Sequence, residues 1–218
     1  VKSTTLSAMI TSATVAISHA YANAGVVPAE DMDQIRSGSS FDIERCDEIE
    51  KETRHDLMAF VRNMSENVKA HAQREPSPSR WIHFGVTSYD VIDTALGMMM
   101  RDSCDVLNQS LEGLLGEINR LDSEHGHHPC IGRTHGIHAE PITFGHKLEG
   151  WREELIRHKA RLEYCKADIS VGKISGPVGI HAHVDRKLEA DICEQLGLRP
   201  DPSSTQIVAR DRHAFLLS

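Results

Sequence analysis

The sequence predicts an all-α protein in which a small N-terminal helical domain, residues 1–87, precedes the beginning of a long-helix bundle domain, residues 88–218. Two observations support this fold class. Apolar residues recur at spacings of three and four through most of the 218 residues, whereas the alternation typical of strands is scarce. Two stretches keep the helical spacing for longer than an ordinary globular helix, which indicates rods of a bundle.

Glycine, proline and serine divide the first domain into helices. Residues 6–24 are rich in Ala, Ser and Thr and should form a helix that ends at Gly25. The apolar run at 6–17 weakly resembles a signal peptide, but Ser and Thr interrupt it, which favours a helix of the folded domain. Pro28 opens a short helix, and residues 37–40 form a loop. Asp42 then caps a helix that runs to about Gln73, before Pro76 and Pro78.

The second domain contains the predicted rods. The first runs from about Ser88 to Glu124, and the second from about Pro141 to Ile169. The apolar positions of the second rod alternate steps of four and three, which is typical of a heptad seam. Residues 172–179 form a glycine-rich turn, 185–196 a short amphipathic helix, and Ser203 or Ser204 should cap a third rod. Because the sequence stops at Ser218, we expect the bundle to be truncated.

Composition limits the function. The net charge of −8 argues against nonspecific nucleic-acid binding, which needs a basic surface. The five cysteines have no tight spacing, which is typical of free thiols in a reducing compartment and favours a cytoplasmic protein. No apolar stretch is long enough to span a membrane, so we expect no membrane partner.

Two segments at helix ends are candidates for binding. His55, with Arg54 and Asp56, could be a surface histidine paired with a neighbouring carboxylate, or it could bind a ligand. Thr87 and Ser88 could be only a helix cap, the commonest use of these residues. Exposed N–H groups and hydroxyls at a helix start also suit a carboxylate or a phosphate.

Two later segments leave similar alternatives. Thr134 and His135 lie in a glycine-flanked turn between the rods, where backbone can approach a ligand and a histidine can move a proton. A structural histidine is an equal alternative there. The Ser203–Gln206 segment is expected at a helix start, and Gln206 taken alone is unremarkable.

A metal site is a weaker interpretation. His125, His127, His128 and Cys130 lie close together in sequence, but their spacing matches no standard zinc pattern. A solvated loop is the better interpretation, although a His/Cys metal-binding module stays an alternative. The glycine-rich segment at 172–179 lacks the order of a phosphate-binding loop and is better explained as a tight connection.

Taken together, these motifs resemble the adenylosuccinate lyases of the fumarase/aspartase superfamily. The matching motifs occur in the same order as in the family, from about Gly25 to Ser218. They correspond to the N-terminal half of such an enzyme. Five stretches carry it, namely Thr53–Asp56, Thr87–Ala95, Gly132–Pro141, Lys173–Gly179, and Ser204–Gln206 with Arg210–Ala214.

The resemblance implies a lyase of purine nucleotide (AMP) biosynthesis that releases fumarate from adenylosuccinate, giving AMP, and from SAICAR, giving AICAR. It implies that His135 is the catalytic acid and that His55 assists it or lies near the substrate phosphate. It implies a substrate-binding role for Arg54, His55, Asp56, Thr87, Ser88, Thr134 and Gln206. No cofactor or metal is expected, and the family assembles as homotetramers with active sites built from three subunits.

Two departures limit what the resemblance implies. The family's base is a serine in the pattern Ser-Ser-x-Met-Pro-x-Lys-x-Asn, which does not occur in the 218 residues, and residues 1–24 lack the family's Arg-Tyr pair. We therefore expect the fragment to be inactive or nearly so by itself. The alternative is a non-catalytic helical scaffold or interaction fragment, which would need neither His135 nor the Thr87–Ser88 helix start.

Overall fold

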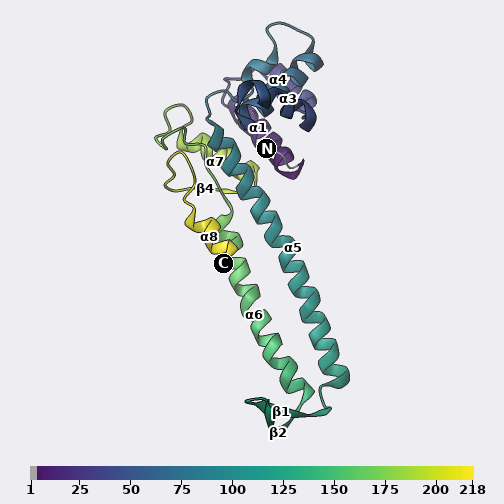
Figure 1. Cartoon of the computed structure of the whole chain (residues 1–218). Coiled ribbons are helices and arrows are strands. Elements are labelled where there is room, and N and C mark those ends of the chain that lie inside the picture. The colour runs from purple at the N-terminus through teal and green to yellow at the C-terminus, as the bar shows by residue number, and fades with distance from the viewer. Residues whose placement is uncertain (1–3) are drawn as a thin grey trace. The chain divides into compact units, whose positions relative to one another are not determined.

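The computed structural model of the chain describes residues 4–218. These residues form helices and two small sheets (Figure 1), which confirms the all-α fold class. They divide into two compact units. The first contains the described residues up to Met100 together with Ile169–Ser218, and the second contains Arg101–Asp168. The expected domain boundary after residue 87 stays a prediction.

Besides α8 (Asp211–Leu217), the first unit is built from six α-helical segments, a 3-10 turn and one small sheet. The six segments are α1 (Thr4–Asn23), α2 (Ala29–Gly38), α3 (Ile43–Thr53), α4 (Asp56–Ala72), the beginning of α5 (Ser88–His125) and α7 (Arg186–Gln195). A 3-10 turn, η1 (Pro78–Trp81), follows α4, and strands β3 (Val171–Gly172) and β4 (Arg199–Pro200) pair in parallel.

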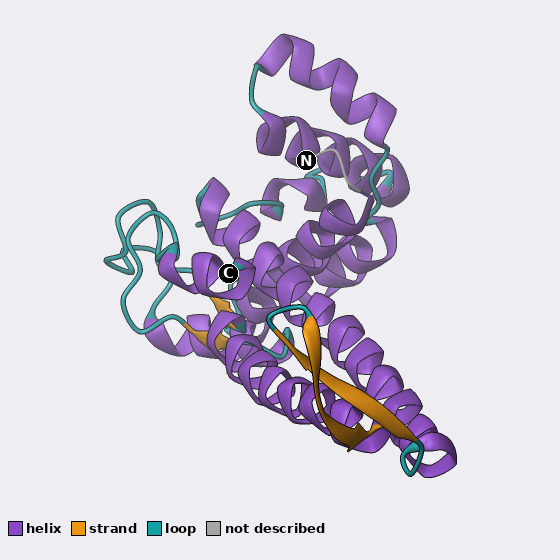
Figure 2. Cartoon of the chain, turned by 60° about the horizontal axis from the view of Figure 1, so that its bottom comes forward, coloured by secondary structure: helices purple, strands orange, loops and turns teal. Residues whose placement is uncertain are grey.

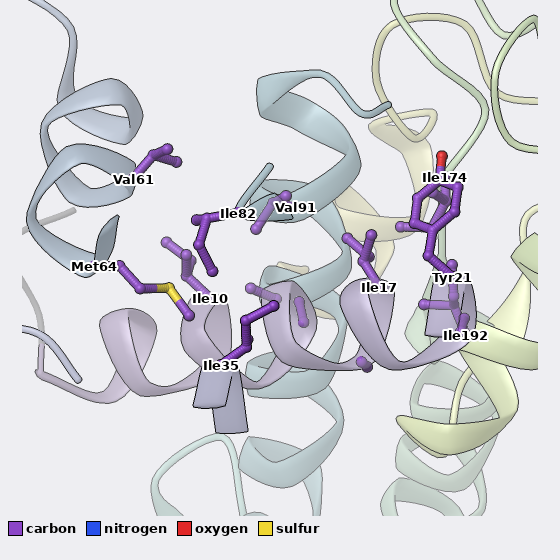
Figure 3. Close-up of a cluster of buried hydrophobic side chains, with 14 of the residues drawn as sticks. Ile10, Ile17, Tyr21, Ile35, Val61, Met64, Ile82, Val91, Ile174 and Ile192 are labelled. Carbon is purple, nitrogen blue, oxygen red and sulfur yellow. The ribbon is translucent and has the colours of Figure 1, made fainter. Parts of the chain in front are cut away.

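Helix α1 lies in the core of this unit, as Figure 3 shows. Ile10, Ile17 and Tyr21 are buried against side chains from α2, α4, α5 and α7. Two hydroxyls on its buried face donate to the helix itself, Thr14 Oγ1 to the carbonyl of Ile10 at 2.8 Å and Ser18 Oγ to the carbonyl of Thr14 at 3.1 Å. Buried polar groups are tolerated when they are hydrogen-bonded in this way. The apolar run that resembles a signal peptide is therefore a core helix of the folded unit.

The single helix expected from Asp42 to Gln73 is wrong, because α3 and α4 are separate. Asp42 caps α3 as expected, accepting from Arg45 N at 3.0 Å. The chain then turns at Arg54, whose φ is 51°, and His55 takes an extended conformation before α4 begins. Residues 50–56 contain no apolar residue, but Ile49 and Leu57 lie eight positions apart and so fall on the same face of a continuous helix, which hides the break.

The two predicted rods are confirmed. Helix α5 contains 38 residues, and α6 runs from Phe144 to Ile169 over 26 residues. Within the second unit the two helices lie side by side and antiparallel (Figure 1). Ion pairs join them, with Lys159 Nζ 2.6 Å from a Glu112 oxygen and Arg152 Nη1 3.3 Å from an Asp122 oxygen. Leu148 and Ile118 are buried between them.

The connection between the rods is a β-hairpin, which the sequence analysis missed (Figure 2). Strands β1 (Pro129–Thr134) and β2 (Ile137–Thr143) pair antiparallel, with an irregularity between Ile131 and Arg133. His135 and Gly136 form the two-residue turn, with φ of 54° and 77°. Positive φ at both central residues is the requirement of a type I′ hairpin turn.

The third rod begins later than expected. Helix α8 spans Asp211–Leu217, so Ser203–Gln206 is an irregular segment and not a helix start. Two residues after this segment, Val208 N donates to Asp93 Oδ2 at 2.8 Å, which ties the chain to the start of α5. The short helix at residues 185–196 is confirmed as α7, which Asp185 caps through Leu188 N at 2.8 Å.

All five cysteines are free thiols. Cys46, Cys104, Cys165 and Cys193 are buried, and Cys130 is partly exposed. Burial raises the pKa of the Cys193 thiol to about 12, and the nearby Glu189 carboxylate adds to the shift. Among the described residues, no helix has the length and the apolar character needed to cross a bilayer.

Candidate functional site

A cavity of about 690 Å³ in the first unit brings together most of the predicted binding residues. It is lined by the end of α3, the start of α4, the start of α5 and the irregular segment before α8. Arg54, His55, Asp56, Ser88 and Gln206 line it, and Glu50, Tyr89 and Ile92 complete it. Five of the seven predicted substrate-binding residues, from three separate segments of the sequence, therefore share one cavity.

Arg54 and His55 enter the cavity because the helix breaks at them. Arg54 holds a left-handed conformation, which is uncommon for a residue other than glycine and concentrates at functional sites. Thr53 Oγ1 supports the break from both sides, accepting from His55 N at 3.4 Å and donating to the His55 carbonyl at 3.2 Å. Arg54 is therefore exposed between the end of α3 and the start of α4, and its guanidinium is accessible to a ligand.

His55 has two ring nitrogens with different uses. Its Nδ1 accepts from Met58 N at 3.4 Å and so caps α4. A neutral ring that accepts at Nδ1 carries its proton on Nε2, which leaves that nitrogen as a donor. Asp56 Oδ1 accepts from Leu57 N at 2.7 Å and lies 3.4 Å from His55 Nδ1. The carboxylate therefore stabilises the positive end of α4.

The start of α5 provides the second side of the cavity. Thr87 lies immediately before the helix, and its N–H donates to Asp90 Oδ2 at 2.8 Å. This contact is the return bond of a capping box, in which a side chain of the first turn accepts from the capping residue. Ser88 lines the cavity, whereas Thr87 lies beside it and is not part of the lining. The cap and the anion-binding interpretations of this segment are therefore compatible.

Gln206 reaches the cavity from a segment that is held on both sides. Ser204 Oγ lies 2.8 Å from Ser175 Oγ, and Val208 N bonds to Asp93. Gln206 itself is exposed, so its amide can donate to and accept from a ligand.

His83 was not among the predicted site residues, although it belongs to the segment that precedes Thr87. Its φ is 64°, and its Nδ1 is buried without a hydrogen-bond partner among residues 4–218. Burial lowers the pKa of His83, the Asp90 carboxylate opposes that shift, and His55 adds to it. Of these two neighbours, His55 lines the cavity and Asp90 lies behind it. A left-handed histidine is not visible in sequence periodicity.

Thr134 and His135 belong to the second unit and do not line the cavity. Both are exposed in the β1–β2 turn. The nearby histidines contact one another, with His125 stacked on His128 at 5.3 Å between ring centroids and His127 4.4 Å from His128. Among the described residues, no three His, Cys, Asp or Glu side chains are placed to hold one metal ion.

The cavity can bind a ligand that carries negative charge and several polar groups. A guanidinium, an imidazole N–H and the N-terminus of a long helix all favour anions. The Glu50 and Asp56 carboxylates and the Gln206 amide can accept hydrogen bonds from the donors of the same ligand. The site therefore discriminates by charge and by hydrogen bonding, with Tyr89 and Ile92 as its apolar surface.

Comparisons with known proteins agree with this geometry. A family model described as "Lyase" matches residues 2–218, including the residues before Gly25 that resemble the family least. The chain is 47% identical to adenylosuccinate lyase of Bacillus subtilis (strain 168) over 195 residues, which is 89% of this chain and 44% of that protein. It is 45% identical to adenylosuccinate lyase of Synechocystis sp. (strain ATCC 27184 / PCC 6803 / Kazusa) over 200 residues, covering 92% and 45%.

Among solved structures, fumarate lyase from Mesorhizobium sp. BNC1 superposes with a TM-score of 0.84 at 28% identity. That match covers 96% of this chain and 49% of the other. The chain thus spans about half the length of the relatives it matches. Because the family model covers the described helices, the cavity and the hairpin alike, the chain belongs to the lyase family.

Proposed function

We propose that this chain carries substrate-binding and acid-supplying residues of an adenylosuccinate lyase. The proposed reactions release fumarate from adenylosuccinate to give AMP and from SAICAR to give AICAR, in purine nucleotide biosynthesis. The support is the family match and the identity of 45–47% to two adenylosuccinate lyases. The proposed substrate is a small anionic nucleotide, with no nucleic-acid or membrane partner.

The chemistry needs three kinds of group. A base removes the proton beside a carboxylate of the succinyl group, and the electron pair left behind forms the double bond of fumarate. The bond between carbon and nitrogen breaks, and an acid protonates the leaving nitrogen. Cations and hydrogen-bond donors stabilise the negative charge that develops on the carboxylate. No cofactor is proposed.

One observation carries the proposal, which is the convergence of Arg54, His55, Asp56, Ser88 and Gln206 on one cavity. The start of α5, at Thr87 and Ser88, suits a substrate carboxylate because its N–H groups and positive end favour anions. Arg54 and the Nε2 proton of His55 suit the phosphate. Gln206 suits the polar edge of a base or a sugar hydroxyl, because its amide both donates and accepts.

His135 is the proposed catalytic acid, with Thr134 beside it. Its exposed position in the hairpin turn leaves the imidazole free to meet a ligand. The proposed assembly is a homotetramer in which one active site draws residues from several subunits. The base is proposed to come from the family's serine loop, which these 218 residues do not contain. The chain alone is therefore expected to bind substrate without turning it over.

Thermal unfolding of the purified chain in the presence of adenylosuccinate tests the proposal. A ligand that binds only the folded form raises the apparent midpoint, by about 5 °C or more at a hundredfold excess over the dissociation constant. Arg54→Asn should abolish this rise, because asparagine tolerates the left-handed conformation but lacks the guanidinium. Arg36→Asn is the matched control, since Arg36 is exposed in the same unit but lies outside the cavity.

Equal midpoints with and without adenylosuccinate would count against the proposal and favour the alternative, a non-catalytic helical scaffold. A rise that Arg54→Asn does not reduce would place the ligand elsewhere. Steady release of fumarate by the chain alone would contradict the expected inactivity, because it would require a base among these 218 residues.

A further inference from the structure

A buried ion pair outside the cavity connects the start of α5 to the glycine-rich segment at 172–179. Asp90, in the first turn of α5, and Lys173, at the start of the glycine-rich segment, are both fully buried. Lys173 Nζ donates to Asp90 Oδ1 and also to the Gly176 carbonyl, the latter at 2.7 Å. Burying two charges is costly unless their remaining hydrogen bonds are satisfied, so such a pair needs a reason.

The other hydrogen bonds of Asp90 show which backbone segments the Asp90–Lys173 pair holds together. Asp90 Oδ1 accepts from the N–H groups of Ser175 and Gly176, each at 3.1 Å. Asp90 Oδ2 accepts from Thr87 N at 2.8 Å. One carboxylate therefore binds the residue before Ser88 with one oxygen and the glycine-rich segment with the other.

The glycine-rich segment in turn contacts Ser204, two residues before Gln206. Ser175 Oγ lies 2.8 Å from Ser204 Oγ. Gly179, with φ of 80°, lies so close to Ser204 that an added Cβ would be 2.1 Å from its carbonyl oxygen. The segment that the sequence suggested was only a tight connection thus packs directly against a wall of the cavity.

We infer that Asp90 and Lys173 are positioning residues for this cavity, holding Ser88 and Gln206 in place from behind. We call the set Thr87, Asp90, Lys173, Ser175 and Ser204 the Asp90 network. The inference rests on the proposed function for the identity of the ligand, but the network itself is defined by contacts within the protein. Neither Asp90 nor Lys173 lines the cavity, so both act through other residues.

The test uses a double variant, Asp90→Asn with Lys173→Met, in the full chain. Removing one partner alone would leave a buried charge unpaired, whereas removing both avoids that cost. Asparagine has one acceptor oxygen, so it cannot accept from the Ser175–Gly176 amides and from Thr87 N together. If the oxygen faces the glycine-rich segment, the amide group meets the Thr87 N–H, and the start of α5 is loosened.

The measurement is the dissociation constant for adenylosuccinate by calorimetry, next to the unfolding midpoint. We expect the double variant to stay folded and its dissociation constant to rise by about tenfold or more. The reason is that the Thr87 N–H loses its acceptor, and a buried donor without a partner is costly. Asp31→Asn is the matched control, because Asp31 is 2% exposed, pairs with Arg80 and lies outside the cavity. It should lower the midpoint and leave the affinity unchanged.

A double variant that keeps its affinity within about twofold would overturn the inference, since an unsatisfied donor should cost more than that. Should the double variant fail to fold, Ser204→Ala removes only the link to Ser175 and tests the same connection. Weaker binding at an unchanged midpoint supports the inference, and unchanged binding overturns it.

Failure of the proposed function would look different. If the unaltered chain does not bind adenylosuccinate, that function is overturned, and the network is judged by amide hydrogen exchange instead. The inference then requires that the N–H groups of Thr87, Ser175 and Gly176 exchange slowly in the parent and together become faster in the double variant. Unchanged exchange at Thr87 would overturn it.

Discussion

At the scale of single residues, His55 serves folding and binding with different atoms. Nδ1 caps α4, while Nε2 is left for a ligand in the cavity. A substitution can therefore separate the two roles if the new side chain still offers an acceptor at the cap. Asparagine is among the best helix caps, and alanine is among the poor ones.

We predict that His55→Ala destabilises the chain by about 1 kcal/mol through the lost cap, whereas His55→Asn preserves the free energy of unfolding. Both should weaken adenylosuccinate binding, because both remove the Nε2 proton. Urea unfolding and calorimetric titration of the two variants measure these effects. Full affinity in His55→Asn would show that the imidazole only caps the helix.

His83 predicts a pH dependence of stability. Burial lowers its pKa below the ordinary value of 6.5, so the unfolded chain binds the proton more readily. The contribution of neutral His83 to the free energy of unfolding is fully present above about pH 6.5. It is lost as the pH falls below about 6.5 and through the lowered pKa of the folded state. We expect His83→Asn, which tolerates the positive φ, to lose less stability between pH 7.5 and 5 than the parent.

Urea unfolding at several pH values would check this difference. The pKa of His213 is also lowered, first by burial and then by Arg210, so it contributes in the same direction. Because His213 and the carboxylates are present in both proteins, the difference isolates His83. Identical pH slopes would mean that His83 is not buried as a neutral group.

At the scale of elements, two glycines of α5 have opposite surroundings. A Cβ added at Gly97 would lie 2.4 Å from the carbonyl oxygen of Val171, whereas one added at Gly113 would meet no atom of the described residues within 4 Å. The close approach at Gly97 lets β3 pack directly on the helix backbone. Gly113 has no such role.

We predict that Gly113→Ala stabilises the chain by about 0.5–1 kcal/mol, because alanine favours the helix and glycine does not. Gly97→Ala should destabilise it by more than that, since a backbone carbonyl cannot move aside as a flexible side chain can. Chemical denaturation of both variants tests the pair. A stabilising Gly97→Ala would contradict the close packing of β3 on α5.

The elements also show what a sequence can predict. Both rods and the short helix near the C-terminus were predictable, because apolar spacing is strong over long helices. The α3–α4 break was not, since Ile49 and Leu57 on either side of it fall on one face of a continuous helix. The hairpin was missed because its turn places a histidine at positive φ, where asparagine or glycine is the usual signal.

At the scale of the whole molecule, the second unit has an apolar groove of about 450 Å³ along α5 and α6. Leu114, Leu121, Leu155 and the half-exposed Trp151 line it. Exposed apolar patches of this kind mark interaction surfaces. The proposed homotetramer would bury this groove against further copies of the chain.

We predict that Trp151→Lys lowers the molar mass of any oligomer that the chain forms, as measured by light scattering. A charge buried in an apolar interface is costly unless it is paired. Val178→Lys is the control, because Val178 is 62% exposed and belongs to the other unit. An unchanged mass for Trp151→Lys would exclude the groove from the interface.

The sequence predicted most of the residues that line the candidate site, but not the residues that hold them in place. Arg54, His55, Asp56, Ser88 and Gln206 were predictable from motifs and do share a cavity. Glu50 and Ile92 were not singled out, because an ordinary helical position gives no signal of facing a ligand. Lys173 belongs to one of the stretches that carry the family resemblance, but it was given no role of its own, since burial of a lysine depends on a partner 83 positions away.

Four of the five thiols are buried, so an alkylating reagent can reach them only when the surrounding structure opens. The rate of their alkylation therefore measures local unfolding. A thiol reacts as the thiolate, so raising the pKa of Cys46, Cys104 and Cys193 suppresses reaction in the folded state. Cys130 should react first with iodoacetamide. Mass spectrometry at rising urea would then show whether Cys193, in the first unit, and Cys104, in the second, become reactive at one concentration or at two.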